Sequence, residues 1–231
     1  MNQIENRFNK GIVDGIPIAL GYLSVSFTFG MMAVSYGLDV WFAVLISLLN
    51  LTSAGQFSGL TLMIEQASLL ELALSQIIIN LRYALMSLSL TQKVESSTSS
   101  AHRSLMSFAI TDEIFAMAAS QPGKVGSSYF YGLMTLPIVG WTLGTLLGAV
   151  AYSLLPQSIQ VALGIAIYGM FIAIIIPPAR KERSVLFVVI VGAITSCILT
   201  WLKVSSGFAV IICAIIAAGL GAICFPIKEG N

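Results

Sequence analysis

The chain has 231 residues, of which 57% are hydrophobic and only 9% charged, and its mean hydropathy is +0.94. A soluble domain of this size would carry about a quarter charged residues, so the composition excludes an ordinary soluble protein and predicts an integral membrane protein. The net charge of +1 comes with no basic stripe that would suit nucleic acid as a partner.

Continuous apolar runs approach the length of about 20 residues that a helix needs to cross a lipid bilayer. Because these runs do not alternate between apolar and polar residues, they predict helices rather than strands. We therefore expect an all-α, polytopic fold with seven or eight transmembrane helices, forming a single domain over residues 1–231. The apolar segments cover residues 15–36, 41–64, 69–90, 105–120, 129–153, 159–177, 184–202 and 206–225.

The second segment is polar at its centre, from Asn50 to Gly59. This pattern predicts a broken helix, whose free backbone N–H groups would suit the carboxylate of a substrate. The alternative is a continuous helix in which Ser and Gly simply permit close packing. Thr52, Ser53 and Gln56 are the candidate substrate-binding residues of this segment.

The third segment carries Arg82 inside an apolar run, about a dozen Å from its nearer end at 1.5 Å per residue. A charge near the centre of a membrane helix costs about 2.5 to 3.5 kcal/mol. Arg82 therefore either holds a substrate carboxylate in a two-point geometry or pairs with an acidic residue of a neighbouring span. These roles are not exclusive, and Asn80 and Tyr83 beside it are further candidates for substrate binding.

The fourth segment is short, about 25 Å if fully helical, and it contains Thr111, Asp112 and Glu113. Adjacent helical residues point about 100° apart, so only one carboxylate is expected to face Arg82. If Arg82, Asp112 and Glu113 were all ionised, their cluster would carry a net charge of −1. This charge favours protonating one carboxylate and offers a route to proton coupling. In the alternative reading, Thr111 or Asp112 caps a half-helix and Glu113 lies in a polar cavity without titrating. The second and fourth segments are the candidates for broken or re-entrant helices.

The fifth segment contains Pro137, which should kink it. It also contains glycines four residues apart that permit close approach of another helix. The glycines are Gly140, Gly144 and Gly148.

The distribution of basic residues predicts the orientation of the chain in the membrane. With eight spans and a cytoplasmic N-terminus, seven basic residues lie inside and three outside, which favours both termini inside. The inner residues are Arg7, Lys10, Lys124, Arg180, Lys181, Arg183 and Lys228, and the outer ones Lys93, Arg103 and Lys203.

The residues that most often carry catalysis or bind metals are sparse. The three cysteines have no CxxC spacing and the single histidine, His102, lies in a polar loop, so we expect no metal site and no cofactor. Neither H-E-x-x-H nor G-x-S-x-G occurs in the sequence, so a membrane protease or hydrolase is not expected.

Three motifs together resemble the AzlC family, the large subunit of bacterial branched-chain amino acid exporters. They are Ser53 to Phe57, Asn80 to Tyr83, and Thr111 to Ala116. Supporting matches are Gly15 to Pro17, the pair Phe29 and Gly30, and Ser87 to Leu90, so that the resemblance runs from residue 10 to about residue 225. Asn50 to Thr52 stand where the family pattern has an aromatic residue.

The resemblance implies export of leucine, isoleucine and valine, and sometimes methionine, across the bacterial cytoplasmic (inner) membrane, driven by the proton gradient. It also implies a small membrane partner of the AzlD type that is needed for activity. The functional motifs of the family map onto Asn80, Arg82, Tyr83, Thr111, Asp112 and Glu113. Two alternatives remain open at this point: a passive channel for small solutes, and a structural membrane subunit without transport activity of its own.

Overall fold

The computed structural model describes residues 7–159, 169, 172 and 175–226. Within these residues the chain is helical, with connecting turns, one isolated β-bridge and no strand. The contacts divide it into two compact units, which are described separately. The first comprises residues 1–57 and 80–160, and the second comprises residues 58–79 and 161–231.

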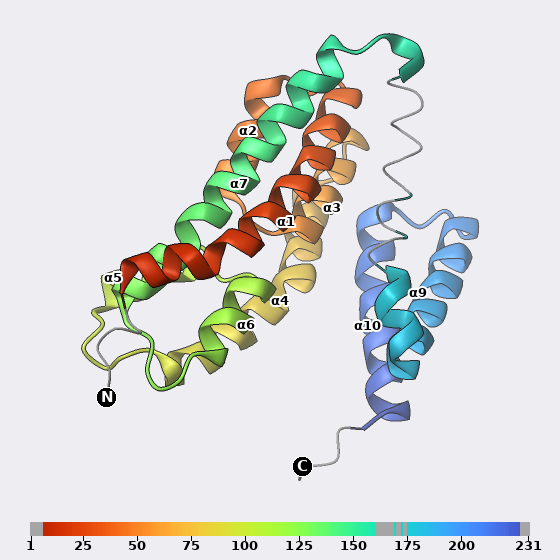
Figure 1. The fold of residues 1–231 in the computed structure, drawn as a ribbon. Helices are drawn as coiled ribbons and strands as arrows, with labels where there is room; N and C mark the ends of the chain where they lie inside the picture. The colour runs from red at the N-terminus through yellow and green to blue at the C-terminus, as the bar shows by residue number, and fades with distance from the viewer. Residues whose placement is uncertain (1–6, 160–168, 170–171, 173–174, 227–231) are drawn as a thin grey trace. The chain divides into compact units, whose positions relative to one another are not determined.

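Helices make up almost all of the described chain (Figure 1). They are α1 (Phe8–Ser35), α2 (Val40–Leu49), α3 (Ser53–Ile64), α4 (Leu69–Lys93), α5 (Ser100–Ser107), α6 (Asp112–Ser120), α7 (Ser127–Leu154), α9 (Arg183–Trp201) and α10 (Ser206–Cys224). Five of these, α1, α4, α7, α9 and α10, are long and apolar enough to cross a membrane. They confirm the first, third, fifth, seventh and eighth predicted segments, whereas the sixth, 159–177, lies mostly outside the described residues.

The first unit is built on α1 and α7, which run parallel and side by side (Figure 1). Gly140, Gly144 and Gly148 of α7 face the backbone of α1, where an added Cβ would meet the carbonyl oxygens of Ala19, Leu23 and Phe27 respectively. The two backbones therefore approach more closely than any larger side chain would allow.

The second predicted segment is a broken helix, as expected. α2 begins after Asp39, whose carboxylate accepts the Trp41 N–H, and it ends before the irregular residues 50–52. The chain then folds back, because Gln56 Nε2 near the start of α3 donates to Ser47 Oγ of α2 at 3.1 Å. In one continuous helix these residues would be about 13 Å apart along the axis, so α2 and the start of α3 form a hairpin rather than a crossing.

The fourth predicted segment is also interrupted, by residues 108–111 between α5 and α6. The chain enters and leaves this pair of helices at one end of the unit, since Val94 and Val125 form a β-bridge in which the Val125 N–H donates to the Lys93 carbonyl at 2.8 Å. The prediction that Lys93 and Lys124 lie on opposite sides of the membrane is therefore wrong. The prediction assumed that the fourth segment forms one helix that crosses the membrane, whereas α5 and α6 are two short helices that fold back on each other.

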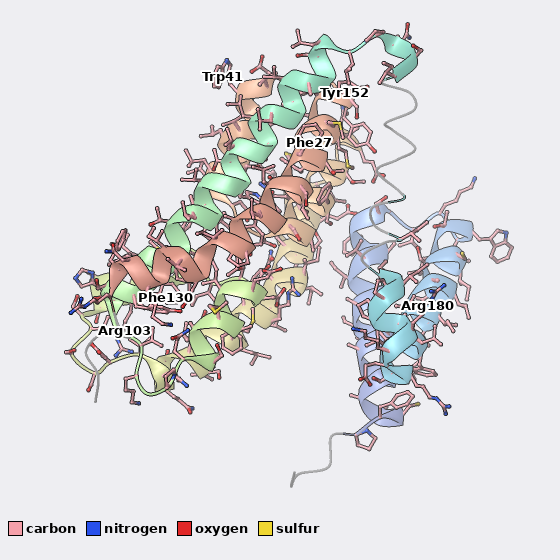
Figure 2. The ribbon with its side chains drawn as sticks, in the orientation of Figure 1. Phe27, Trp41, Arg103, Phe130, Tyr152 and Arg180 are labelled. Atoms are coloured by element: carbon pink, nitrogen blue, oxygen red, sulfur yellow. The ribbon has the colours of Figure 1, made fainter. Side chains whose placement is uncertain are left out.

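The two hairpins enter the first unit from opposite ends. α1 begins at the end where α6 finishes, because Lys10 Nζ donates to Gln121 Oε1 at 2.7 Å, and α2 starts shortly after the other end of α1. Figure 2 shows Trp41 of α2 and Arg103 of α5 at these opposite ends. Both hairpins turn near the middle of the unit, where the polar residues lie.

In the second unit α9 packs against α10. Glu71, in the first turn of α4, is only 6% exposed, and its Oε1 accepts the N–H groups of Gly207 at 2.9 Å and Phe208 at 3.3 Å. A carboxylate at this place satisfies two backbone donors of the first turn of α10 and complements the positive end of the helix dipole.

Candidate functional site

The middle of α4 touches both helix breaks of the first unit. Thr52 Oγ1, in the break between α2 and α3, donates to Asn80 Oδ1 at 2.6 Å. Arg82 Nη1 lies 2.7 Å from Asp112 Oδ2, at the start of α6. The predicted motif around Arg82 thus connects two breaks that are about sixty residues apart in sequence.

Each break is followed by a helix that a threonine caps. Thr52 Oγ1 accepts the Gly55 N–H at 3.2 Å, and Thr111 Oγ1 accepts the Ile114 N–H at 3.4 Å. Thr111 therefore caps α6, whereas the proton-coupling role of Asp112 and Glu113 stays a prediction. The positive ends of two short helix dipoles, α3 and α6, meet in this region, and such ends favour anionic groups.

Tyr22 of α1 joins this site to the main helix pair. Its phenolic oxygen is 2.5 Å from Thr111 Oγ1 and 2.6 Å from Glu113 Oε2. A phenol has one proton, so when it donates to the Glu113 carboxylate, the Thr111 hydroxyl is left to donate to the phenol. Glu113 therefore faces α1 while Asp112 faces α4, which is the divergence expected of neighbouring residues on a helix.

A cavity of about 230 Å³ lies beside these groups, within the first unit. Its polar lining residues are Tyr22, Ser53, Tyr83, Thr111, Asp112 and Glu113. The remaining lining residues are mostly apolar and comprise Pro17, Ile18, Gly21, Val25, Leu51 and Trp141. Pockets for drug-sized ligands measure about 300–1,000 Å³, so this cavity suits a smaller molecule with both polar and apolar groups.

Arg82 stands next to the cavity rather than in its lining. Its guanidinium carbon is 5.0 Å from the centre of the Tyr83 ring, and Tyr83 does line the cavity. In the ion pair, the side chains of Arg82 and Asp112 are 48% and 46% exposed. The pair is therefore accessible, and either partner can be reached by another charged group without unpacking of the core.

Gln56 lies apart from the cavity, although the sequence placed it among the substrate-binding candidates. It is only 3% exposed, its Oε1 accepts the Trp141 Nε1–H at 2.9 Å, and its Nε2 donates to Ser47. Thr52 and Asn80 bond to each other at the break, whereas Ser53, Tyr83, Thr111, Asp112 and Glu113 line the cavity. The substrate-binding, proton-coupling and packing roles assigned to these residues and to the glycines of α7 stay predictions.

Sequence reasoning missed Tyr22 and Trp141. Both are aromatic residues within apolar runs, where an aromatic side chain is usually part of the core, so no local pattern marks them. Asp14 is a further such residue, because it accepts hydrogen bonds from Lys10, Gln121 and Tyr129 and so ties α1 to the end of α6 and the start of α7. Its odd place within a helix otherwise free of acidic residues was the available signal.

Comparison with known proteins gives consistent matches. The family described as "AzlC protein" matches residues 17–155, a range that contains every residue of the cavity lining. An "Uncharacterized membrane protein" of Archaeoglobus fulgidus is 32% identical over 81% of the chain and 82% of its own length. The "Inner membrane protein YgaZ" of Escherichia coli is 26% identical over 77% of the chain and 75% of its own length. An "Uncharacterized membrane protein" of Helicobacter pylori is 30% identical over 66% of the chain and 68% of its own length. No solved structure matches the chain.

Proposed function

The chain belongs to the AzlC family of membrane proteins, and on this premise we propose that it is the transporting subunit of a secondary transporter. Its substrates are the branched-chain amino acids leucine, isoleucine and valine, with methionine as a further substrate. It exports them across the cytoplasmic membrane, works with a small membrane subunit of the AzlD type, and uses the proton gradient.

One observation carries this proposal: the lining of the first unit's cavity combines two carboxylates with apolar side chains. An aliphatic amino acid needs an anionic group for its ammonium, donors for its carboxylate and an apolar wall for its side chain. Asp112 and Glu113 suit the ammonium. The Ser53 end of α3, at the positive end of its dipole, and the Arg82 guanidinium suit the carboxylate.

The size of the apolar wall fits a family of related substrates rather than a single one. One methylene changes binding in an apolar pocket by only about 1–3 kcal/mol. Ile18, Val25 and Leu51 present no hydrogen-bonding side chain that would select one aliphatic amino acid over another. Broad specificity among leucine, isoleucine and valine follows from such a wall.

Proton coupling is assigned to Asp112 and Glu113. Ammonium binding needs at least one ionised carboxylate, and the neighbouring carboxylates repel each other when both are ionised. Arg82 balances Asp112 directly, so we assign the coupling role to Glu113, whose carboxylate accepts a hydrogen bond from Tyr22. Proton binding and ammonium binding then compete for one site, which is the requirement for exchange transport.

The hairpin form of the second and fourth segments also supports both termini in the cytoplasm. If neither hairpin crosses the membrane, nine basic residues lie inside and only Lys203 outside, with Arg82 within the membrane. If both segments cross instead, giving eight crossings, seven basic residues lie inside and three outside. The positive-inside rule favours the arrangement with the larger excess of basic residues inside, in which neither hairpin crosses.

Efflux of labelled leucine from proteoliposomes tests the proposal, with and without the small subunit and with and without an imposed pH gradient. We expect saturable efflux that depends on the gradient and on the partner. Efflux that rises linearly with leucine and ignores the gradient would indicate a passive channel. Efflux absent from every combination, with the protein correctly folded, would contradict the transporter assignment.

A further inference from the structure

Trp141 lines the cavity of the first unit. It is 1% exposed and is the largest side chain of the apolar lining. Its indole meets the Tyr22 ring edge-on, with centroids 5.1 Å apart and ring planes at 76°. Since the hydroxyl of the same Tyr22 reaches Glu113, one aromatic side chain connects this carboxylate to Trp141.

The indole of Trp141 is fixed by a closed set of buried hydrogen bonds. Its Nε1–H donates to Gln56 Oε1 at 2.9 Å, and Gln56 Nε2 donates to Ser47 Oγ at 3.1 Å. Ser47 Oγ lies 2.7 Å from Thr145 Oγ1, and Thr145 lies one turn after Trp141 on α7 and donates to its carbonyl at 3.1 Å. The ring of bonds joins α2, α3 and α7.

This arrangement is unusual for the task of packing alone. An apolar wall of aliphatic side chains would fill the same space with no buried polar group, and each buried donor left without a partner costs about 1–3 kcal/mol. Here the amide of Gln56 uses its oxygen on the indole and donates from its nitrogen to Ser47, and it holds the indole plane in one orientation. A wall fixed in this way cannot rotate to admit a larger side chain.

We propose that Trp141 determines the specificity of the site by limiting the size of the substrate side chain, and that Gln56 is its positioning residue. The inference rests on the proposed function and names the residues that choose among its substrates. Gln56, a substrate-binding candidate in the sequence, acts through Trp141 and does not itself touch the amino acid.

Relative transport of valine, leucine, methionine and phenylalanine tests this inference. In Trp141→Phe the lost part of the indole leaves room, so kcat/KM for methionine or phenylalanine relative to valine should rise about tenfold, the lower end of the effect of one methylene. Gln56→Leu keeps the indole but removes the acceptor of its hydrogen bond, so it should shift the ranking of the four substrates in the same direction. Gln56→Glu in its neutral form accepts from the indole and donates to Ser47, so it should keep the parent ranking.

Fluorescence provides a readout that is independent of transport. Trp41 and Trp201 are 69% and 82% exposed, so replacing both with Phe leaves Trp141 as the only tryptophan, whose emission can be excited selectively. We expect leucine to change this emission saturably, and Gln56→Leu to shift the emission in the absence of leucine. Trp201→Phe alone is the matched control and should leave the substrate ranking unchanged.

The outcomes separate the inference from the function on which it rests. Leucine efflux with the same substrate ranking in Trp141→Phe and Gln56→Leu would overturn the role of Trp141 and leave the transporter standing. A uniform loss of transport for all four substrates, with unchanged ratios of kcat/KM, would also overturn the role of Trp141, since it indicates structural damage only. Absence of leucine efflux in the parent protein would overturn the proposed function, and the inference with it.

Discussion

The guanidinium of Arg82 lies 2.7 Å from the carboxylate of Asp112, and about half of each side chain is uncovered by the rest of the protein. A charge pair exposed to lipid at this depth would be costly. We therefore propose that the pair faces a space that admits water. Accessible ion pairs contribute only about 0–1 kcal/mol to folding, so we attribute this pair to transport.

Replacing Arg82 should separate transport from folding. We expect Arg82→Ala to abolish leucine efflux while the free energy of unfolding changes by less than about 1 kcal/mol, because the lost pair is accessible. Efflux and thermal unfolding in detergent measure the two effects. Lys203→Ala, which removes a cation from the turn between α9 and α10, is the control. Loss of the Arg82→Ala protein from the membrane would instead favour a structural subunit.

Glu113→Gln should uncouple transport from the proton gradient. The amide oxygen can still accept the hydrogen bond from Tyr22, but the side chain no longer titrates. We expect leucine efflux that has lost its response to an imposed pH gradient, measured in proteoliposomes. Glu65→Gln, at an exposed carboxylate between α3 and α4, should respond as the parent does. A full response in Glu113→Gln would exclude this carboxylate as the coupling group.

The contact between α1 and α7 should not tolerate larger residues. A methyl group added at Gly148 would overlap the Phe27 carbonyl, and overpacking typically costs about 1–3 kcal/mol or more. We expect Gly148→Ala to lower the unfolding temperature and the amount of protein in the membrane. At Gly219 of α10 an added Cβ meets nothing within 4 Å, so Gly219→Ala should be neutral. Equal stability of the two variants would refute close packing at Gly148.

Glu71 should stabilise the second unit through its two hydrogen bonds to the start of α10. Glu71→Ala leaves the N–H groups of Gly207 and Phe208 without this acceptor, at a cost of about 1–3 kcal/mol. Glu71→Gln retains an acceptor oxygen and should recover most of the loss. Thermal unfolding of the purified variants checks whether Glu71→Gln is more stable than Glu71→Ala. If Ala and Gln were equally stable, the hydrogen bonds would not be the source of stability.

Several features of the fold and the site are predictable from sequence because their signals are local. Uninterrupted apolar runs mark the long helices, and the polar stretch that begins at Asn50 marks the first break. Arg82 and Asp112 are visible because a charge in an apolar run is costly and needs a partner. Helical geometry alone predicts that Asp112 and Glu113 diverge.

Other features depend on contacts between distant residues, for which one sequence holds no signal. Glu71 meets Gly207 across 136 positions, and near the end of an apolar run it looks like a solvated residue. Tyr22 and Trp141 are indistinguishable from core aromatics until the rotation of α1 and α7 is known. The side on which Lys93 lies depends on whether α5 and α6 fold back, and hydropathy does not report this.

The central claim, that the cavity is the transport site for aliphatic amino acids, is tested most directly at Gly21. This glycine lines the cavity, and a Cβ added there meets nothing within 4 Å, so Gly21→Leu should fill the site without straining the fold. Gly219→Leu places the same side chain on α10 in open space. We predict that saturable leucine efflux is lost in Gly21→Leu and kept in Gly219→Leu, with both proteins folded. Parent-like efflux in Gly21→Leu would show that leucine does not pass through this cavity.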